Sequence, residues 1–310
     1  MPVASAWNPT HLPEKPWKAG AIVRLILGVF IGIMMGALVA MAFRYFETPH
    51  TSSPVWLMAA VVAGLASYIA AVFFLMRPWP PPEQYLMRLI WLLSYIYGGI
   101  LFTWLESRFI VGKTELQNPV LNMVIAELSF QGTAIVLVHF FLREHSTNWR
   151  EGFGLNNRPT HASLIGICAG VLVLYPAWGL QELSVRLFRS LAFHPHEQQA
   201  VEILRHAEGL LGRVAAGFGT IIIAPIGEEL IFRGILYPAV KRSYGRPIAL
   251  WSTALLFGAI HANIASFLPL TLLAVTLVLL YEYTGNLLAP IAVHCVFNAA
   301  NFVELYRQQN

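Results

Sequence analysis

Charged residues are scarce in this chain, since Asp, Glu, Lys and Arg make up only 12% of its 310 residues. A soluble globular domain carries about 25% charged residues. Hydrophobic residues account for 57% of the chain, and its mean hydropathy is +0.61. This composition argues against a soluble protein and predicts one that is integral to a membrane.

Cysteine is also scarce, with two residues in the whole chain. Cys168 and Cys295 both fall inside apolar segments, where a small buried side chain is the expected role, so we expect no disulfide framework. The net charge of +4 comes from basic residues scattered between apolar segments. That spread does not favour nucleic acid as a partner.

Long apolar segments dominate what is present. Several approach the roughly 20 residues that a helix needs to cross the hydrocarbon core, and helices are the expected form because lipid offers no partner for an unpaired backbone group. We therefore expect an all-α, polytopic integral membrane protein with about eight to nine transmembrane helices. The segments are Leu25–Phe43, Val55–Met76, Leu89–Leu105, Leu121–Leu142, Leu164–Leu180, Val214–Val240, Ile248–Ile260, Phe267–Leu280 and Leu287–Phe302.

The polar residues divide the chain into three parts. Residues 1–18 are predicted to form a flexible tail, residues 19–142 a set of accessory transmembrane helices, and residues 161–305 a domain that holds most of the membrane-embedded polar side chains. The polar stretch Gln181–Arg213 is expected to form amphipathic helices at the membrane interface. The distribution of Lys and Arg predicts a cytoplasmic N-terminus and a cytoplasmic Lys241–Arg246 loop.

The adjacent acids Glu228 and Glu229 stand out because they lie inside an apolar segment. A charged side chain at the membrane centre costs about 2.5–3.5 kcal/mol, and such groups usually mark function. Arg233 follows Glu229 by four residues, so the two can pair on one helix face. Glu228 lies about 100° away around the helix. We therefore predict an internal Glu229–Arg233 ion pair and a free Glu228. The alternative is that both acids are structural.

The next apolar segment contributes Phe257-Gly-Ala-Ile-His261. A short turn, Lys241–Pro247, makes this helix antiparallel to the one before it. Glu228 and His261 are about equally far from that turn, which places both at roughly 20 Å depth. Depth matching therefore predicts that Glu228 and His261 meet. A lone membrane histidine that merely satisfies a hydrogen bond is the competing interpretation.

The last apolar segment carries His294, Asn298 and Asn301 at spacings of four and three, which places them on one helix face. Such a stripe can hold helices together by hydrogen bonds. Its occurrence together with Glu228 and His261 favours catalysis instead.

These groups suit hydrolysis of an amide bond. Glu228 is the candidate general base that deprotonates a water molecule, with His261 orienting that water or sharing its proton. His294 and Asn298 offer donors for the oxyanion that forms on the attacked carbonyl.

A zinc-dependent version of the site is the weaker alternative. Glu228, His261 and His294 would supply three ligands and leave the fourth position open. The sequence contains no His-Glu-x-x-His motif. We therefore expect no cofactor and no metal.

The three motifs resemble those of the CPBP family, the CAAX-processing proteases and bacteriocin-processing or immunity proteins that include the Ras-converting CAAX endopeptidase. They are Glu-Glu-x-x-x-Arg, Phe-x-x-x-His and His-x-x-x-Asn, in that order on separate apolar segments, and the approach Thr284-Gly285-Asn286-Leu287-Leu288-Ala289-Pro290 is similar to bacterial members. The likeness covers roughly residues 160–305, and the chain shows no departure at the motif positions.

The resemblance implies an intramembrane endopeptidase in which Glu228 activates water with His261. It also implies that His294 and Asn298 stabilise the oxyanion, with support from Glu229, Arg233 and Phe257. The expected substrate is a membrane-anchored peptide or protein, a class that includes lipidated ones. The similarity to bacterial members also implies a prokaryotic plasma membrane.

Two further functions stay open from the sequence. A membrane immunity or scaffold protein of the same fold would need none of the catalytic chemistry. An ion-coupled transporter is suggested by the buried acids, although the paired broken helices typical of transporters are missing.

Overall fold

The computed structural model describes residues 12, 15–47, 55–77, 85–110, 119–193, 201 and 209–307. Within these residues, eight helices are long and apolar enough to cross a membrane. A ninth apolar helix, Arg246–Ile260, is shorter. The described residues form helices and connecting turns without strands, which confirms the all-α, polytopic architecture.

The chain divides into two compact units. The smaller unit, Gly20–Leu137, contains α1 (Ala19–Glu47), α2 (Val55–Met76), α3 (Tyr85–Ile110), α4 (Pro119–Glu127), the π-helix η2 (Leu128–Gly132) and the start of α5 (Thr133–Glu144). Its core lies between α1, α2 and α3, where Ile31, Tyr68 and Leu92 are buried.

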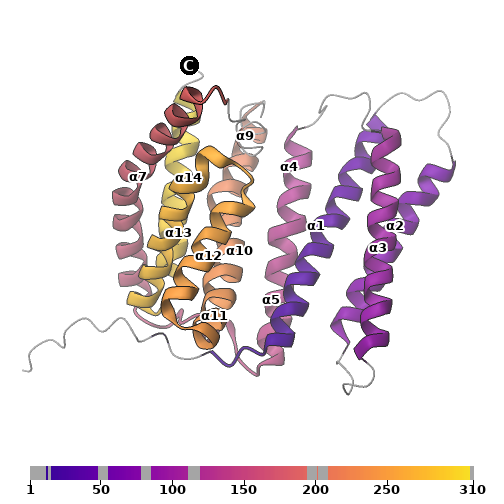
Figure 1. The fold of residues 1–310 in the computed structure, drawn as a ribbon, viewed down its shortest axis with the longest axis horizontal. Coiled ribbons are helices and arrows are strands. Elements are labelled where there is room, and N and C mark those ends of the chain that lie inside the picture. Colours follow the sequence, from indigo (N-terminus) through magenta and orange to yellow (C-terminus); the bar gives the residue numbers. More distant parts are fainter. Residues whose placement is uncertain are drawn as a thin grey trace, which may run out of the picture. The chain divides into compact units, whose positions relative to one another are not determined.

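The larger unit comprises Met1–Ala19 and Val138–Asn310 and holds all the predicted site residues (Figure 1). After α5 come the short α6 (Trp149–Gly152) and the long α7 (Pro159–Ser190). A continuous helical segment then runs from residue 209 to residue 244. It is followed by α12 (Arg246–Ile260), α13 (Ile264–Thr284) and α14 (Leu288–Arg307).

Glycines let the helices of the larger unit approach closely, as is common where lipid supplies no hydrophobic drive for association. A Cβ atom on Gly170 of α7 would lie 2.8 Å from the Val296 side chain of α14. One on Gly258 of α12 would lie 2.7 Å from the Thr271 hydroxyl of α13. Both α13 and α14 pack against α7, and α13 packs against α12. This packing sets the positions of α12 and α14, which carry His261 and His294.

A buried carboxylate fixes the turn between the continuous segment and α12. Glu282 of α13 accepts hydrogen bonds from the Tyr237 hydroxyl at 2.5 Å, Lys241 Nζ at 2.5 Å and Arg246 Nε at 2.7 Å. Three donors on both sides of the turn therefore converge on one helix, and they hold α12 antiparallel to the preceding segment as the short turn predicted.

The Thr284-Gly285-Asn286 stretch is held by a loop that follows α6. Asn286 is fully buried, and its side chain donates to the Asn157 carbonyl at 2.8 Å and accepts from the Leu288 amide at 2.9 Å. Gly285 caps α13 with a φ of 61°, a conformation that suits glycine. These contacts fix where α14 begins.

Two predictions concern segments that the structure covers only in part. The interfacial helices expected over Gln181–Arg213 fall partly outside the described residues, because residues 194–200 and 202–208 are not described. The first part of this stretch, up to Ser190, continues α7. The flexible tail expected over residues 1–18 is described at Leu12 and at residues 15–18. There Trp17 is 1% exposed and packs within the larger unit.

Candidate active site

Two π-helical stretches interrupt the continuous segment on either side of the paired glutamates. The order is α9 (Gly209–Phe218), η3 (Gly219–Ile223), α10 (Ala224–Glu229), η4 (Leu230–Leu236) and α11 (Tyr237–Tyr244). Pro225 and Pro238 each stand in the first turn after a π-helical stretch. Proline has no backbone N–H and its ring clashes with the carbonyl four residues earlier. Such π-turns are frequent at functional sites.

The predicted Glu229–Arg233 ion pair is present. Arg233 Nη1 donates to Glu229 Oε1 at 2.9 Å, and both side chains are almost fully buried. Arg233 Nη2 also donates to the Ala274 carbonyl of α13 at 3.2 Å, and the guanidinium lies 4.6 Å from the centre of the Phe257 ring. A buried charge needs such pairing and hydrogen bonding, so Arg233 compensates Glu229 and ties η4 to α13.

Glu229 has a second partner that the sequence did not predict. His294 of α14 places Nδ1 2.9 Å from the same carboxylate oxygen, Glu229 Oε1. A carboxylate that accepts from one ring nitrogen fixes the orientation of the imidazole. Glu229 therefore links Arg233 to His294 and directs His294 Nε2 toward Glu228.

Glu228 occupies the position expected of a reactive group. Its Oε2 lies 3.8 Å from His294 Nε2, which is beyond direct hydrogen-bond distance. The side chain is 12% exposed, and Oε2 is buried without a hydrogen-bond partner among the described residues. Buried polar groups are normally paired, and an unpaired one calls for an explanation such as a catalytic role or a bound water.

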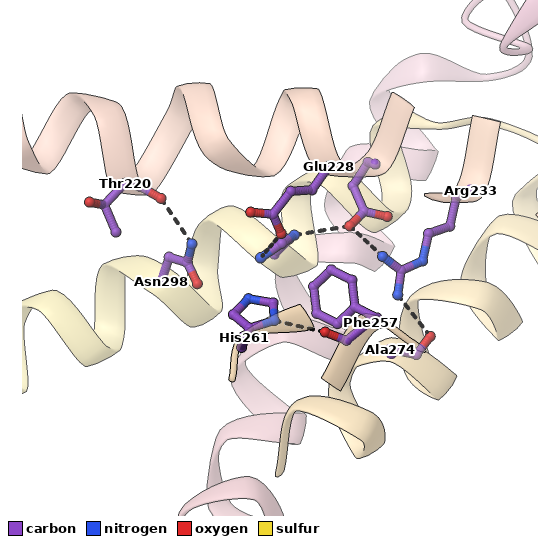
Figure 2. A network of polar contacts seen from close by, with 9 residues as sticks. Thr220, Glu228, Arg233, Phe257, His261, Ala274 and Asn298 are labelled. Carbon is purple, nitrogen blue, oxygen red and sulfur yellow. Dashed lines mark hydrogen bonds and ion pairs between the residues drawn. The ribbon is translucent and has the colours of Figure 1, made fainter. Parts of the chain in front are cut away.

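His261 is held by its own helix. Its Nδ1 lies 2.7 Å from the Phe257 carbonyl, and the two rings are 5.0 Å apart. Because a carbonyl only accepts, Nδ1 carries the proton and Nε2 is left as an acceptor. The Phe257 ring also contacts the His294 ring at 5.7 Å. The expected meeting of Glu228 and His261 is not a direct hydrogen bond in the described structure. Both belong to the network of Figure 2.

The two asparagines of the polar stripe of α14 bond to two different helices. Asn298 Nδ2 donates to the Thr220 carbonyl of η3 at 2.9 Å. Asn301 instead accepts from Trp178 Nε1 at 2.9 Å and donates to the Phe297 carbonyl at 3.0 Å. Asn301 thus joins α14 to α7, whereas Asn298 joins α14 to the continuous segment that carries the glutamates.

The donor set does not form a metal centre in the described part of the chain, which contains no group of three or more His, Cys, Asp or Glu side chains that could hold a metal ion. The zinc alternative, with Glu228, His261 and His294 as ligands, stays untested. The expectation that the protein uses no cofactor stays a prediction.

The residue after His261 has a strained backbone. Ala262 adopts a φ of 50° between α12 and α13, and its amide bonds to the Ala259 carbonyl at 3.0 Å. The left-handed conformation costs a residue with a Cβ about 1–2 kcal/mol. Such strain persists where the surroundings over-determine it, often at functional sites.

Relief of that strain is measurable. Ala262→Gly is expected to raise the free energy of unfolding by up to about 1 kcal/mol, because glycine adopts positive φ without steric cost but loses more entropy on folding. Denaturant unfolding of detergent-purified protein measures the change. Ala259→Gly, one turn earlier in regular α12, is the control and is expected to be destabilising.

Comparison with known proteins finds matches in this region of the chain. Residues 211–300 match the family model described as "Type II CAAX prenyl endopeptidase Rce1-like". The stretch contains every predicted site residue from Glu228 to Asn298.

Two curated relatives come from Bacillus subtilis (strain 168). "Uncharacterized protein YpbD" is 36% identical over 86 residues, which cover 26% of this chain and 41% of that protein. "Putative membrane peptidase YdiL" is 32% identical over 77 residues, covering 25% of this chain and 32% of that protein. The chain thus matches less than half the length of either relative.

No solved structure gives a significant match. The family match nevertheless confirms the resemblance drawn from the three motifs. Residues 211–300 of this integral membrane protein are thus similar to the Rce1-like type II CAAX prenyl endopeptidases.

Proposed function

We propose that this protein is an intramembrane endopeptidase in which Glu228 activates a water molecule to hydrolyse a peptide bond. The observation that carries the proposal is the Glu228 carboxylate, buried among membrane-spanning helices with Oε2 unpartnered in the described structure. A carboxylate oxygen without a direct hydrogen bond to the protein at such a site is available to a water molecule. The family match at residues 211–300 supports the same chemistry.

Two acceptors would hold the attacking water. Glu228 accepts one O–H, and His261 Nε2 accepts the other because the Phe257 carbonyl keeps the proton on Nδ1. Glu228 then takes the proton as the water oxygen bonds to the carbonyl carbon. When the C–N bond breaks, the same proton passes from Glu228 to the departing amine. Water is divided between the two products, and no covalent enzyme intermediate is needed.

Two donors would stabilise the oxyanion. Asn298 Nδ2 carries two hydrogens, of which one is donated to the Thr220 carbonyl. His294 would donate from Nδ1 to Glu229 and from Nε2 to the oxyanion. Both donations together require that both ring nitrogens are protonated. That charge state balances the site, because two carboxylates then face two cations, Arg233 and the His294 imidazolium. A balanced set is what a buried cluster of charges requires.

The proposed substrate is a membrane-associated peptide or protein, and lipidated peptides belong to this class. The site lies on helices with the length and composition of membrane spans, so the scissile bond must reach it at or near the membrane. The description of the matching family names a prenyl endopeptidase, which makes a farnesylated peptide the first probe.

Cleavage of a quenched fluorescent peptide library, half of it farnesylated, tests the proposal. Wild type, Glu228→Gln and His261→Ala would be compared as purified proteins in detergent, each with and without a zinc chelator. The proposal expects turnover by wild type that survives the chelator and is lost in both variants. Turnover lost with the chelator would overturn the metal-free mechanism. A correctly folded wild type that cleaves no peptide would favour an immunity or scaffold function.

The two asparagines of α14 provide a matched pair for the oxyanion donor. Asn298→Ala is expected to lower kcat about 10²-fold with little change in KM, because an oxyanion bond strengthens mainly in the transition state. Asn301→Ala removes an amide of the same helix that only joins α14 to α7 and Phe297. It should change kcat less than about threefold, since such interhelical bonds contribute about 0.6 kcal/mol. Equal effects on kcat would show that Asn298 merely holds helices together.

A further inference from the structure

The residues just before α1 are bound tightly to the larger unit. Five hydrogen bonds connect Lys15–Lys18, here called the N-terminal strap, to residues 145–242. Trp17 is 1% exposed, and its ring packs edge-on against Phe141 at 5.1 Å and His145 at 5.2 Å. A segment held by so many specific contacts has a defined position on the unit.

The indole of Trp17 bonds to a backbone carbonyl of the π-helical stretch η4. Trp17 Nε1 donates to the Gly234 carbonyl at 3.0 Å in a buried environment. In a π-helix the donor to this carbonyl is the amide five residues later, which belongs to Ala239. The α-helical donor four residues later is absent, because Pro238 has no N–H. Trp17 therefore gives the Gly234 carbonyl a donor from outside the helix where Pro238 removes the α-helical one.

A second buried aromatic residue, Phe153, also packs against this turn. A Cβ atom on Gly234 would lie 2.6 Å from Phe153 Cε1, and Phe153 is fully buried. Gly234 therefore lies in close contact with Phe153 and accepts from Trp17. The backbone of η4 has little freedom to shift at this residue, which directly follows Arg233.

Further contacts hold the strap where Trp17 needs it. Arg242 of α11 donates from Nη1 to the Lys15 carbonyl at 3.2 Å and from Nη2 to the Trp17 carbonyl at 3.0 Å. Lys15 Nζ donates to the Glu151 carbonyl at 3.4 Å, and burial lowers the pKa of this Lys15 ammonium. The strap thus forms hydrogen bonds with two residues of the continuous segment, Gly234 in η4 and Arg242 in α11.

We propose that Trp17 is a positioning residue for the site, acting through the π-helical turn at Gly234. A fixed η4 places Arg233 on Glu229, and Glu229 places His294 against Glu228. The effect of the strap on turnover rests on the proposed function. Its effect on the η4 backbone does not.

Hydrogen–deuterium exchange over residues 230–240 tests the backbone claim in the full-length protein. Trp17→Phe keeps an aromatic ring but removes the indole N–H, and it is expected to speed exchange there about tenfold, as for the loss of a buried hydrogen bond. Arg242→Gln, at an exposed side chain, removes both guanidinium bonds to the strap and is expected to speed exchange in the same peptides. Because Arg242 is exposed, this variant should fold.

Two controls make the result specific to the Gly234 carbonyl. Trp178→Phe removes another hydrogen-bonded indole of the same unit, whose partner is Asn301, and should leave exchange at 230–240 unchanged. Pro238→Ala restores a backbone N–H four residues after Gly234. In that background Trp17→Phe should have clearly less than its tenfold effect. Unchanged exchange in Trp17→Phe, or an equal effect with and without Pro238, would overturn the proposal.

Turnover separates the strap from the proposed function. On a peptide that wild type cleaves, Trp17→Phe should lower kcat several-fold and leave KM unchanged, because Trp17 lies away from the substrate. If Trp17→Phe speeds exchange at residues 230–240 but leaves kcat unchanged, Trp17 is not a positioning residue for the site. If wild type cleaves nothing in the library, the proposed hydrolysis fails while the exchange experiment still decides whether the strap holds η4.

Discussion

Glu228→Gln is expected to lower kcat for peptide hydrolysis by about 10³- to 10⁴-fold, the upper range for loss of a general base. Glutamine keeps the shape of the side chain and cannot take a proton from water. Glu228 Oε2 accepts no hydrogen bond from the described residues, so the substitution removes no structural hydrogen bond from that oxygen. Purified variants assayed on one cleavable peptide measure kcat and KM separately.

Two controls distinguish loss of the base from loss of the fold. Glu182→Gln alters a solvent-exposed acid of α7 that pairs with Arg186 at 2.6 Å, and turnover should stay at the wild-type level. The thermal transition of Glu228→Gln should lie close to that of wild type, because Glu228 Oε2 has no hydrogen bond to lose. Residual turnover above about a tenth of wild type would assign the general base to another group.

The sequence predicted the features of this site that depend on one helix at a time. Hydropathy located the apolar spans, and the four-residue spacing gave the Glu229–Arg233 pair, which the structure confirms at 2.9 Å. Local periodicity is enough for such contacts because both partners share a backbone. The Glu229–His294 bond joins α10 to α14, 65 residues apart in sequence. Helical spacing carries no information about that contact.

The π-helical stretches also escaped the sequence analysis, although two signals for them were present. Pro225 and Pro238 each break the α-helical hydrogen-bond ladder in the apolar segment that holds the glutamates. An α-helical wheel drawn through such a segment loses its register after each π-turn. The wheel still separated Glu228 from Glu229 correctly, because both lie within the short α-helical stretch α10.

Trp17 shows the same limit at the N-terminus. Proline and tryptophan before the first apolar segment suggested a flexible tail. Composition alone does not reveal that Trp17 has a hydrogen-bond partner 217 residues away. The missing donor at Pro238 could have raised the question of what satisfies the Gly234 carbonyl. It could not have named Trp17, since the answer depends on how the strap packs.

Arg233→Met is expected to lower the free energy of unfolding by about 3–5 kcal/mol, the cost of leaving a buried charge without its partner. The chain supplies its own comparison, because Glu182 and Arg186 form a second pair at the same four-residue spacing on an exposed surface. Arg186→Met should change stability by less than about 1 kcal/mol. Both variants would be unfolded with denaturant in the same detergent.

The double variant Glu229→Gln/Arg233→Met should recover part of the lost free energy of unfolding, because it removes the unpaired carboxylate. Equal effects of Arg233→Met and Arg186→Met would mean that the buried pair contributes no more than a surface contact, and Arg233 would then have no part in holding Glu229 against His294.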